Sequence, residues 1–256
     1  MDKVKVLNIS IDNLSTQELL HKLDLYGGIL FTPNVDHMIN LQKDKDFYHA
    51  YQKADYRVCD GQVLRYTVKL FLGQSIKEKI SGSDFFPTFC DYHKNNKNIK
   101  IFLLGAAEGV AKKAQEKINT RVGRELVVDV HSPSYGFEKD EEECLKIIDL
   151  INNSGANVLA VGVGAPKQEK WIIKYKEKLS NITIFMAIGA TIDFEAGHKP
   201  RAPKWVSEAG LETFFRLSSE PKRLWKRYLV NDPPIFLWLM KQKLNLYKNP
   251  FELTNN

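Results

Sequence analysis

The stretch that most constrains the fold of this chain is residues 157–171, NVLAVGVGAPKQEKW. Its first eight positions are nearly all apolar or glycine, which is typical of a strand covered on both faces of a parallel sheet. Pro166 then suits the first turn of a helix, where its missing N–H costs nothing, and residues 168–170 are good helix formers. In a doubly wound α/β fold such a strand-to-helix turn lies at the carboxyl edge of the sheet, where ligands bind and helix starts attract anions.

The rest of the first 198 residues repeats this alternation of short apolar segments and amphipathic ones. Ser15 predicts a helix N-cap, and Asn34 or Asp36 caps a helix that we expect to run to Ala54. We therefore expect an α/β fold for residues 1–198, with a Rossmann-like open, mainly parallel sheet and helices on both faces. Its strands are predicted at residues 29–32, 56–59, 99–104, 126–130, 157–164 and 182–188, and residues 4–9 predict a first strand suited to an edge.

The C-terminal part of the chain differs in charge and pattern. Residues 199–248 contain 11 basic and 4 acidic side chains, whereas residues 1–198 contain 26 of each. Its amphipathic segments include KRLWKRYL and IFLWLM, which are too short to span a bilayer but suit its interface. We expect residues 199–256 to form a helical, basic appendage with a polyanionic partner: a membrane surface, a nucleic acid or a phosphorylated substrate.

Several classes of protein and site are disfavoured. The N-terminus has no apolar signal region, so a cytoplasmic protein is expected. Cys59, Cys90 and Cys144 are far apart and form no CxxC pair, which argues against a disulfide framework or a zinc site. The histidines show no metal-ligand spacing and no DxD occurs, so we expect no bound metal. GVGAPK and GAAEGV lack the full dinucleotide fingerprint, so an NAD cofactor is not expected.

Four turns that follow predicted strands should converge on one edge of the sheet: residues 32–34, 60–61, 105–109 and 162–169. Asp60 is the sharpest candidate among them. A carboxylate at the end of a short apolar strand can face a cleft and act as a general base. The alternative is that Asp60 and Gly61 are an ordinary turn pair.

Three polar residues at these turns have two possible roles each. Gln168 either bonds a sugar hydroxyl or lies on a helix without a ligand. Thr32 and Asn34 either bind a ligand or cap the next helix.

Read in order, several motifs resemble the WecG/TagA/CpsF glycosyltransferase family over nearly the whole chain: TPNVDHMINLQKD, ADYRVCDGQ, KEKISGSDFF, VGVGAPKQEKW, AIGATIDFEAGHKPRAPKW and GLETFFRLSSEPKRLWKRYL. The resemblance implies a metal-independent, inverting enzyme that needs no cofactor. It would transfer N-acetylmannosamine or its uronic acid from a UDP donor to a polyprenyl-diphosphate-linked acceptor sugar, in the synthesis of teichoic acid, capsule or exopolysaccharide.

The resemblance also implies roles for individual residues. Asp60 would be the general base for the acceptor hydroxyl, and the donor-sugar pocket would be lined by Thr32, Asn34 and Gln168. Lys79 stands where the family usually has an arginine, and it would hold a diphosphate without the bidentate fork. Four residues match cationic positions of an appendage that closes over the site at the membrane: Arg216, Arg223, Lys226 and Arg227.

Two other functions stay open at this point. One is a nucleotide- or nucleic-acid-binding module without chemistry, and the other is an NAD-linked UDP-sugar epimerase. The tail argues against nucleic acid, because its aromatic residues cluster with leucine rather than alternate with basic residues. We therefore expect a peripheral protein on the inner face of the cell membrane, bound to anionic lipid, whose apolar tail could pair with a second copy off the membrane.

Overall fold

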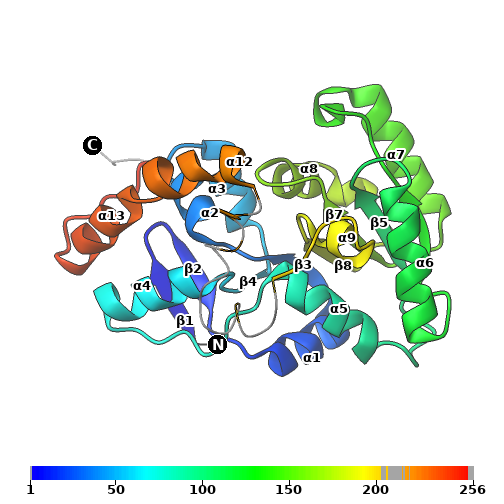
Figure 1. Ribbon diagram of the computed structural model, residues 1–256, viewed down its shortest axis with the longest axis horizontal. Helices are drawn as coiled ribbons and strands as arrows, with labels where there is room; N and C mark the ends of the chain where they lie inside the picture. Colours follow the sequence, from blue (N-terminus) through cyan, green and yellow to red (C-terminus); the bar gives the residue numbers. More distant parts are fainter. Residues whose placement is uncertain (1, 203–205, 207–214, 216, 219, 253–256) are drawn as a thin grey trace.

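The computed structural model describes residues 2–202, 206, 215, 217–218 and 220–252. It contains a six-stranded sheet with the strand order β4-β3-β8-β7-β5-β6, in which every neighbouring pair is parallel (Figure 1). Helices cover both faces, so the predicted open α/β sheet is confirmed. The strands are β3 (Gly28–Phe31), β4 (Tyr56–Arg57), β5 (Ile101–Gly105), β6 (Val127–His131), β7 (Val158–Gly162) and β8 (Ile184–Ala187).

The sheet separates two hydrophobic cores. In β5, Phe102 and Leu104 face one core, whereas Ile101 and Leu103 face the other. Successive side chains of a strand point to opposite faces, so a strand with a core on each side must be apolar at every position. This requirement explains the uninterrupted apolar run of β7.

Each core is closed by its own set of helices. The first core lies under α2 (Val35–Asn40), α3 (Lys45–Gln52), α4 (Gln62–Leu72), α7 (Glu141–Asn153) and α8 (Lys167–Tyr175). The second lies under α1 (Thr16–Tyr26), α5 (Gly82–Tyr92), α6 (Val110–Val122) and α9 (Thr191–Glu195). Two short 3-10 turns, η1 (Phe137–Lys139) and η2 (Lys176–Lys178), flank α7 and α8.

Two predicted elements differ from the structure. Residues 4–9 do not form one edge strand, because the chain reverses within them at Leu7, whose φ is +51°, and makes a separate antiparallel hairpin of β1 (Lys3–Val6) and β2 (Ile9–Asp12). The single helix expected up to Ala54 is divided into α2 and α3. Asp44 accepts the N–H of Phe47 at 3.0 Å and so caps a new helix.

The described part of the C-terminal segment packs against the first core. It consists of α12 (Pro221–Lys226), the π-helical turn η3 (Arg227–Asn231) and α13 (Pro234–Lys243). Ile235 and Leu239 of α13 are fully buried, and Gln242 bonds the backbone of Lys5 and Leu7 in the hairpin. In Figure 1 these orange helices lie beside the blue hairpin and α4.

Candidate active site

The turns that follow β3 and β4 lie against each other at the carboxyl edge of the sheet. The backbone N–H of Asp60 donates to the carbonyl oxygen of Pro33 at 2.9 Å. Thr32 is buried, while Asn34 and Asp60 are half-buried. The structure thus brings together three of the residues that the sequence singled out, although they belong to different turns.

The turns after β5, β7 and β8 pack closely against one another, backbone to backbone, at glycine positions. A Cβ added at Gly162 would lie 2.6 Å from the carbonyl oxygen of Gly189, and one added at Gly105 would lie 2.5 Å from that of Gly162. Real Cβ atoms do not come this close to a carbonyl oxygen, so glycine is required at both positions. The tight packing holds the starts of α8 and α9 at the same edge as Asp60.

Gln168 serves mainly to tie two of these turns together. Its side chain is buried, and its Oε1 accepts the N–H of Gly164 at 3.2 Å and that of Gly189 at 3.1 Å. Its Nε2 donates to Oε1 of Glu169 at 2.8 Å. Three bonding positions of the amide are therefore used inside the protein, and its second N–H has no acceptor among the described residues.

Glu169 is a feature that sequence reasoning missed. Its side chain is fully buried, and burial raises its pKa to about 7, against the lowering effect of the bond from Gln168. Its Oε2 has no hydrogen-bond partner among the described residues. At this position the sequence shows only a helix-forming residue, and nothing in the local pattern reveals the burial.

Glu169 and Asp60 share an aromatic neighbour in the first core. Burial, and then the charges of Glu169 and Asp60, raise the pKa of Tyr51. The hydroxyl of Tyr51 lies 2.7 Å from Nδ1 of His37, and burial lowers the pKa of this histidine to about 3. His37 is therefore neutral at physiological pH, and it is not an acid or base for chemistry near pH 7.

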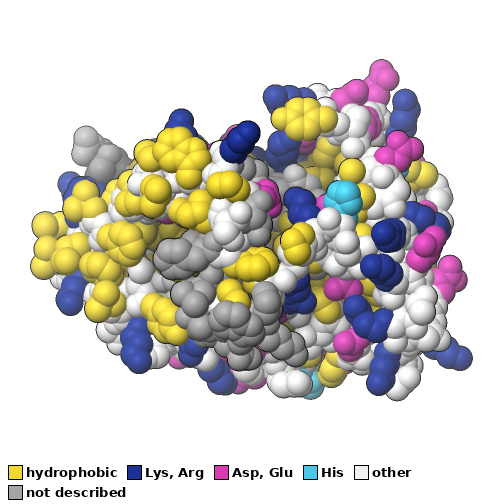
Figure 2. Space-filling view, viewed as in Figure 1, with side chains coloured by type: hydrophobic (Ala, Val, Ile, Leu, Met, Phe, Trp, Pro, Cys, Tyr) yellow, Lys and Arg dark blue, Asp and Glu magenta, His cyan; other side chains and the backbone are white. Residues whose placement is uncertain are grey.

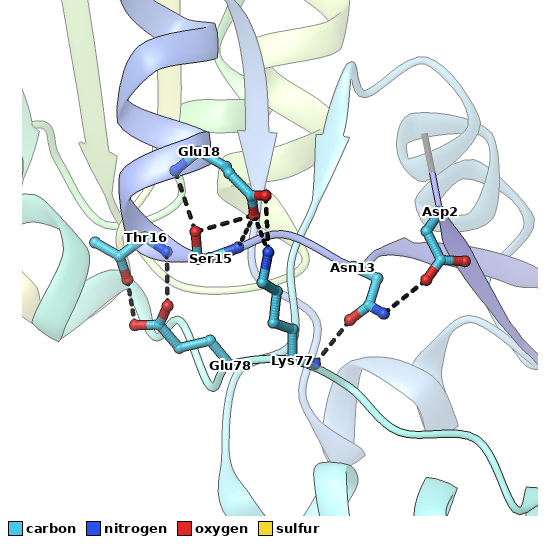
Figure 3. A network of polar contacts seen from close by, with 7 residues as sticks. All are labelled: Asp2, Asn13, Ser15, Thr16, Glu18, Lys77 and Glu78. Atoms are coloured by element: carbon cyan, nitrogen blue, oxygen red, sulfur yellow. Dashed lines mark hydrogen bonds and ion pairs between the residues drawn. The ribbon is translucent and has the colours of Figure 1, made fainter.

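The loop that leads to Lys79 is fixed to the start of α1 (Figure 3). The carboxylate of Glu78 accepts both the N–H and the hydroxyl of Thr16, at 2.7 and 2.6 Å. Lys77 pairs with Glu18 at 2.7 Å. Glu18 and Ser15 form the capping box of α1, which confirms the predicted N-cap.

Lys79 lies beside the candidate base but is already paired. The N–H of Ile80 donates to the carbonyl oxygen of Cys59 at 2.8 Å, which holds Lys79 next to the Asp60 turn. Nζ of Lys79 lies 2.9 Å from Oδ2 of Asp84. Burial tends to raise the pKa of Asp84, but hydrogen bonds from Lys79 and Ser81 outweigh it and lower the pKa. A diphosphate at Lys79 would compete with this carboxylate.

The structure describes only some of the predicted cationic side chains of the C-terminal segment. Nη2 of Arg227 lies 3.4 Å from Oδ1 of Asn34, so this arginine reaches the site. Lys226 is exposed at the end of α12. Arg216 and the side chain of Arg223 lie outside the described residues.

Two kinds of feature are absent from the described part of the chain. No group of three or more His, Cys, Asp or Glu side chains there is arranged to hold a metal ion. None of the described helices has the length and apolar character needed to cross a membrane.

Comparison with known proteins identifies the class of enzyme to which the chain belongs. The chain is 27% identical over 219 residues to the N-acetylglucosaminyldiphosphoundecaprenol N-acetyl-beta-D-mannosaminyltransferase of Bacillus subtilis (strain 168), and the match covers 86% of this chain and 81% of that enzyme. The profile of the glycosyl transferase WecG/TagA/CpsF family matches residues 4–249. The match includes both the sheet and the C-terminal helices. The chain belongs to the WecG/TagA/CpsF family and is a glycosyltransferase.

Proposed function

We propose that this glycosyltransferase moves an N-acetylmannosamine-type sugar from a UDP donor to an N-acetylglucosamine that is linked to a polyprenyl diphosphate. The observation that carries the proposal is the long match to the Bacillus subtilis enzyme, whose name states this sugar and this acceptor. A nucleotide- or nucleic-acid-binding module without chemistry and an NAD-linked UDP-sugar epimerase both fit the family assignment less well.

The position of Asp60 supports a direct displacement. Its carboxylate takes the proton of the acceptor hydroxyl while the hydroxyl oxygen attacks the anomeric carbon of the donor sugar. The bond between that carbon and the diphosphate oxygen breaks, and UDP leaves with the electron pair. Attack from the face opposite the leaving group inverts the anomeric configuration.

The departing diphosphate needs positive charge or N–H donors, and we assign these to the protein rather than to a metal ion. We propose this role for Lys79, because the bond from the N–H of Ile80 to the carbonyl oxygen of Cys59 holds it next to the Asp60 turn. Lys226 and the arginines at positions 216 and 223 come from the basic C-terminal segment. The N–H groups at the start of α8 add to the positive electrostatic potential that would stabilise the diphosphate.

We further propose that residues 199–256 attach the enzyme to the inner face of the cell membrane, where a polyprenyl-linked acceptor lies. Figure 2 shows hydrophobic side chains gathered over α12 and α13, with lysine and arginine around them. The exposed apolar residues there include Trp225, Leu229, Phe236, Leu237, Met240 and Leu244. Apolar side chains with basic neighbours suit the interface of an anionic bilayer.

A donor panel tests the proposed reaction. Release of UDP would be measured from UDP-N-acetylmannosamine, its uronic acid, UDP-N-acetylglucosamine and UDP-glucose, with a lipid-linked N-acetylglucosamine acceptor and with or without EDTA. The expected result is transfer from an N-acetylmannosamine-type donor that survives EDTA. Transfer from another donor alone would refute the sugar assignment, and loss of activity in EDTA would refute the metal independence.

A further inference from the structure

The side chain of Asn34 is held by two hydrogen-bond donors, one three residues away and one from the distant C-terminal segment. Its Oδ1 accepts the backbone N–H of His37 at 3.1 Å, which caps α2, and lies 3.4 Å from Nη2 of Arg227. Both partners can only donate, so the oxygen end of the amide faces them. The amide nitrogen, which also can only donate, is the end that remains for a substrate.

Arg227 is itself held between two carboxylates. Its Nε lies 3.5 Å from Oδ1 of Asp36 on α2 and 4.0 Å from Oδ2 of Asp232, directly after η3. The N–H of Asp232 donates to the carbonyl oxygen of Arg227 at 2.8 Å, and the guanidinium lies 5.6 Å from the ring centre of Tyr228. These contacts cover most of the side chain, which is 27% exposed.

The contact between Arg227 and Asn34 lies close to the candidate base. Asn34 directly follows Pro33, whose carbonyl oxygen accepts the N–H of Asp60. A change in the direction of the Asn34 amide therefore takes place beside the reacting groups. The arginine that fixes this amide belongs to the C-terminal segment, which is far away in the sequence.

We propose that Arg227 is a positioning residue for the transfer reaction: clamped by Asp36 and Asp232, it turns the amide nitrogen of Asn34 toward the substrate. Asn34 then donates a hydrogen bond to an acceptor oxygen of the donor sugar. This inference rests on the proposed function, because it needs a sugar nucleotide at this edge. It gives Arg227 a role other than the diphosphate binding that the sequence suggested, since two carboxylates already engage its charge.

A consequence is that sugar binding depends on the docked C-terminal segment. When η3 is in place, Asn34 presents a donor. Without Arg227, the amide of Asn34 loses one of the two hydrogen bonds that define its direction and can turn its oxygen toward the substrate. Two hydrogen-bond acceptors would then face each other, and no bond to the sugar would form.

The test compares donor KM, kcat and the thermal unfolding midpoint for the full-length chain and four variants. Asn34→Asp is nearly isosteric and keeps the oxygen that His37 and Arg227 require, but it replaces the donor nitrogen. Arg227→Gln removes the clamp, and Arg227→Lys keeps the charge near both carboxylates while losing the reach to Asn34. Lys222→Gln removes an exposed charge from α12 and serves as the control.

The expected result is a donor KM about tenfold higher in Asn34→Asp and in both Arg227 variants, the effect of one lost hydrogen bond, with a smaller change in kcat. Asn34→Asp should unfold at the wild-type temperature. The double variant Asn34→Asp with Arg227→Gln should be no worse than Asn34→Asp alone, because both changes remove the same interaction. If Arg227→Gln does not fold, Arg227→Lys replaces it in the comparison. The control Lys222→Gln should keep the wild-type donor KM.

Two outcomes would overturn the inference while leaving the proposed function intact. One is an unchanged donor KM in Asn34→Asp. The other is an Arg227 effect of the same size in the Asn34→Asp background, which would mean that Arg227 acts independently of Asn34. A wild-type chain that transfers from none of the UDP-sugars would instead refute the proposed function, and the inference with it.

Discussion

The backbone N–H of Asp60 donates to the carbonyl oxygen of Pro33, and this bond joins the turn with the candidate base to the turn with Thr32 and Asn34. The two turns follow neighbouring parallel strands, β3 and β4. The candidate base is thereby held beside two residues, Thr32 and Asn34, that we propose to bind the donor sugar. The link uses the backbone N–H of residue 60, so it does not depend on which side chain stands there.

Asp60→Asn should abolish most of the transfer activity and leave the fold unchanged. The substitution keeps the shape of the side chain and its backbone bond, but an amide cannot take the proton of the acceptor hydroxyl. We expect kcat to fall by about 10²–10⁴-fold, with a small change in donor KM. UDP release and thermal unfolding would be measured together. Asp46→Asn, an exposed residue of α3, is the matched control, and near-wild-type turnover of Asp60→Asn would rule out the base assignment.

Glu169→Gln should change how stability depends on pH. The pKa of Glu169 is about 7 in the folded protein and has a reference value of 4.5. Between these values the folded state keeps a proton that the unfolded state releases, so stability falls as pH rises from about 4.5 to about 7. The full cost, present above pH 7, is on the order of 3 kcal/mol. The glutamine variant should therefore be more stable than the wild type at pH 8, with a difference that shrinks toward pH 4.5.

Urea unfolding at a series of pH values checks this expectation. Glu142→Gln removes an exposed carboxyl from the first turn of α7 and should leave the slope against pH as in the wild type. Parallel curves for Glu169→Gln and the wild type would show that Glu169 is ionised in the folded protein.

Most of the sheet could be predicted from sequence because its signals are local. An apolar run, a glycine or proline and a helix start are read within about 15 residues, and the turns at residues 32–34, 60–61, 105–109 and 162–169 were found in this way. Parallel strands place such turns at one edge. The predicted edge strand at residues 4–9 was wrong, because the chain reverses at Leu7. The apolar pattern of a hairpin across this reversal looks the same in sequence as that of one continuous strand.

The site could be predicted only in part, since its remaining features join distant residues. Asn34 and Arg227 are separated by 193 positions, and no local pattern indicates their contact. The burial of Glu169 likewise depends on packing around α8. Gln168 was identified from its position, but only the structure reveals that its oxygen serves Gly164 and Gly189.

Gly162→Ala should lower both stability and activity. The added Cβ would lie 2.6 Å from the carbonyl oxygen of Gly189 and 2.9 Å from Cδ1 of Ile192. A backbone carbonyl cannot move aside cheaply, so the turns after β7 and β8 must separate, at a cost of about 1–3 kcal/mol. That separation would also disturb the bonds from Gln168.

Gly123→Ala provides the comparison. Gly123 has a φ of +73° at the end of α6, and a Cβ there meets no atom within 4 Å. The variant should lose about 1–2 kcal/mol from backbone strain alone and keep wild-type kcat and KM. Equal activity losses in the two variants would mean that the crowding at Gly162 has no specific effect on the site.

Leu237→Glu should weaken membrane binding without unfolding the protein. Leu237 on α13 is 58% exposed, so its apolar side chain contributes little to the core. A charge at this position opposes insertion into a bilayer interface. Sedimentation with vesicles that contain anionic lipid should show less bound protein than for the wild type. Transfer to a lipid-linked acceptor should fall, while transfer to a water-soluble acceptor should not. Leu25→Glu is the control. Leu25 is 56% exposed on α1, which packs on the second core, so this variant should bind vesicles like the wild type. If Leu237→Glu binds vesicles like the wild type but changes a dimer into a monomer, the apolar surface of α13 covers a second copy of the chain and not a membrane.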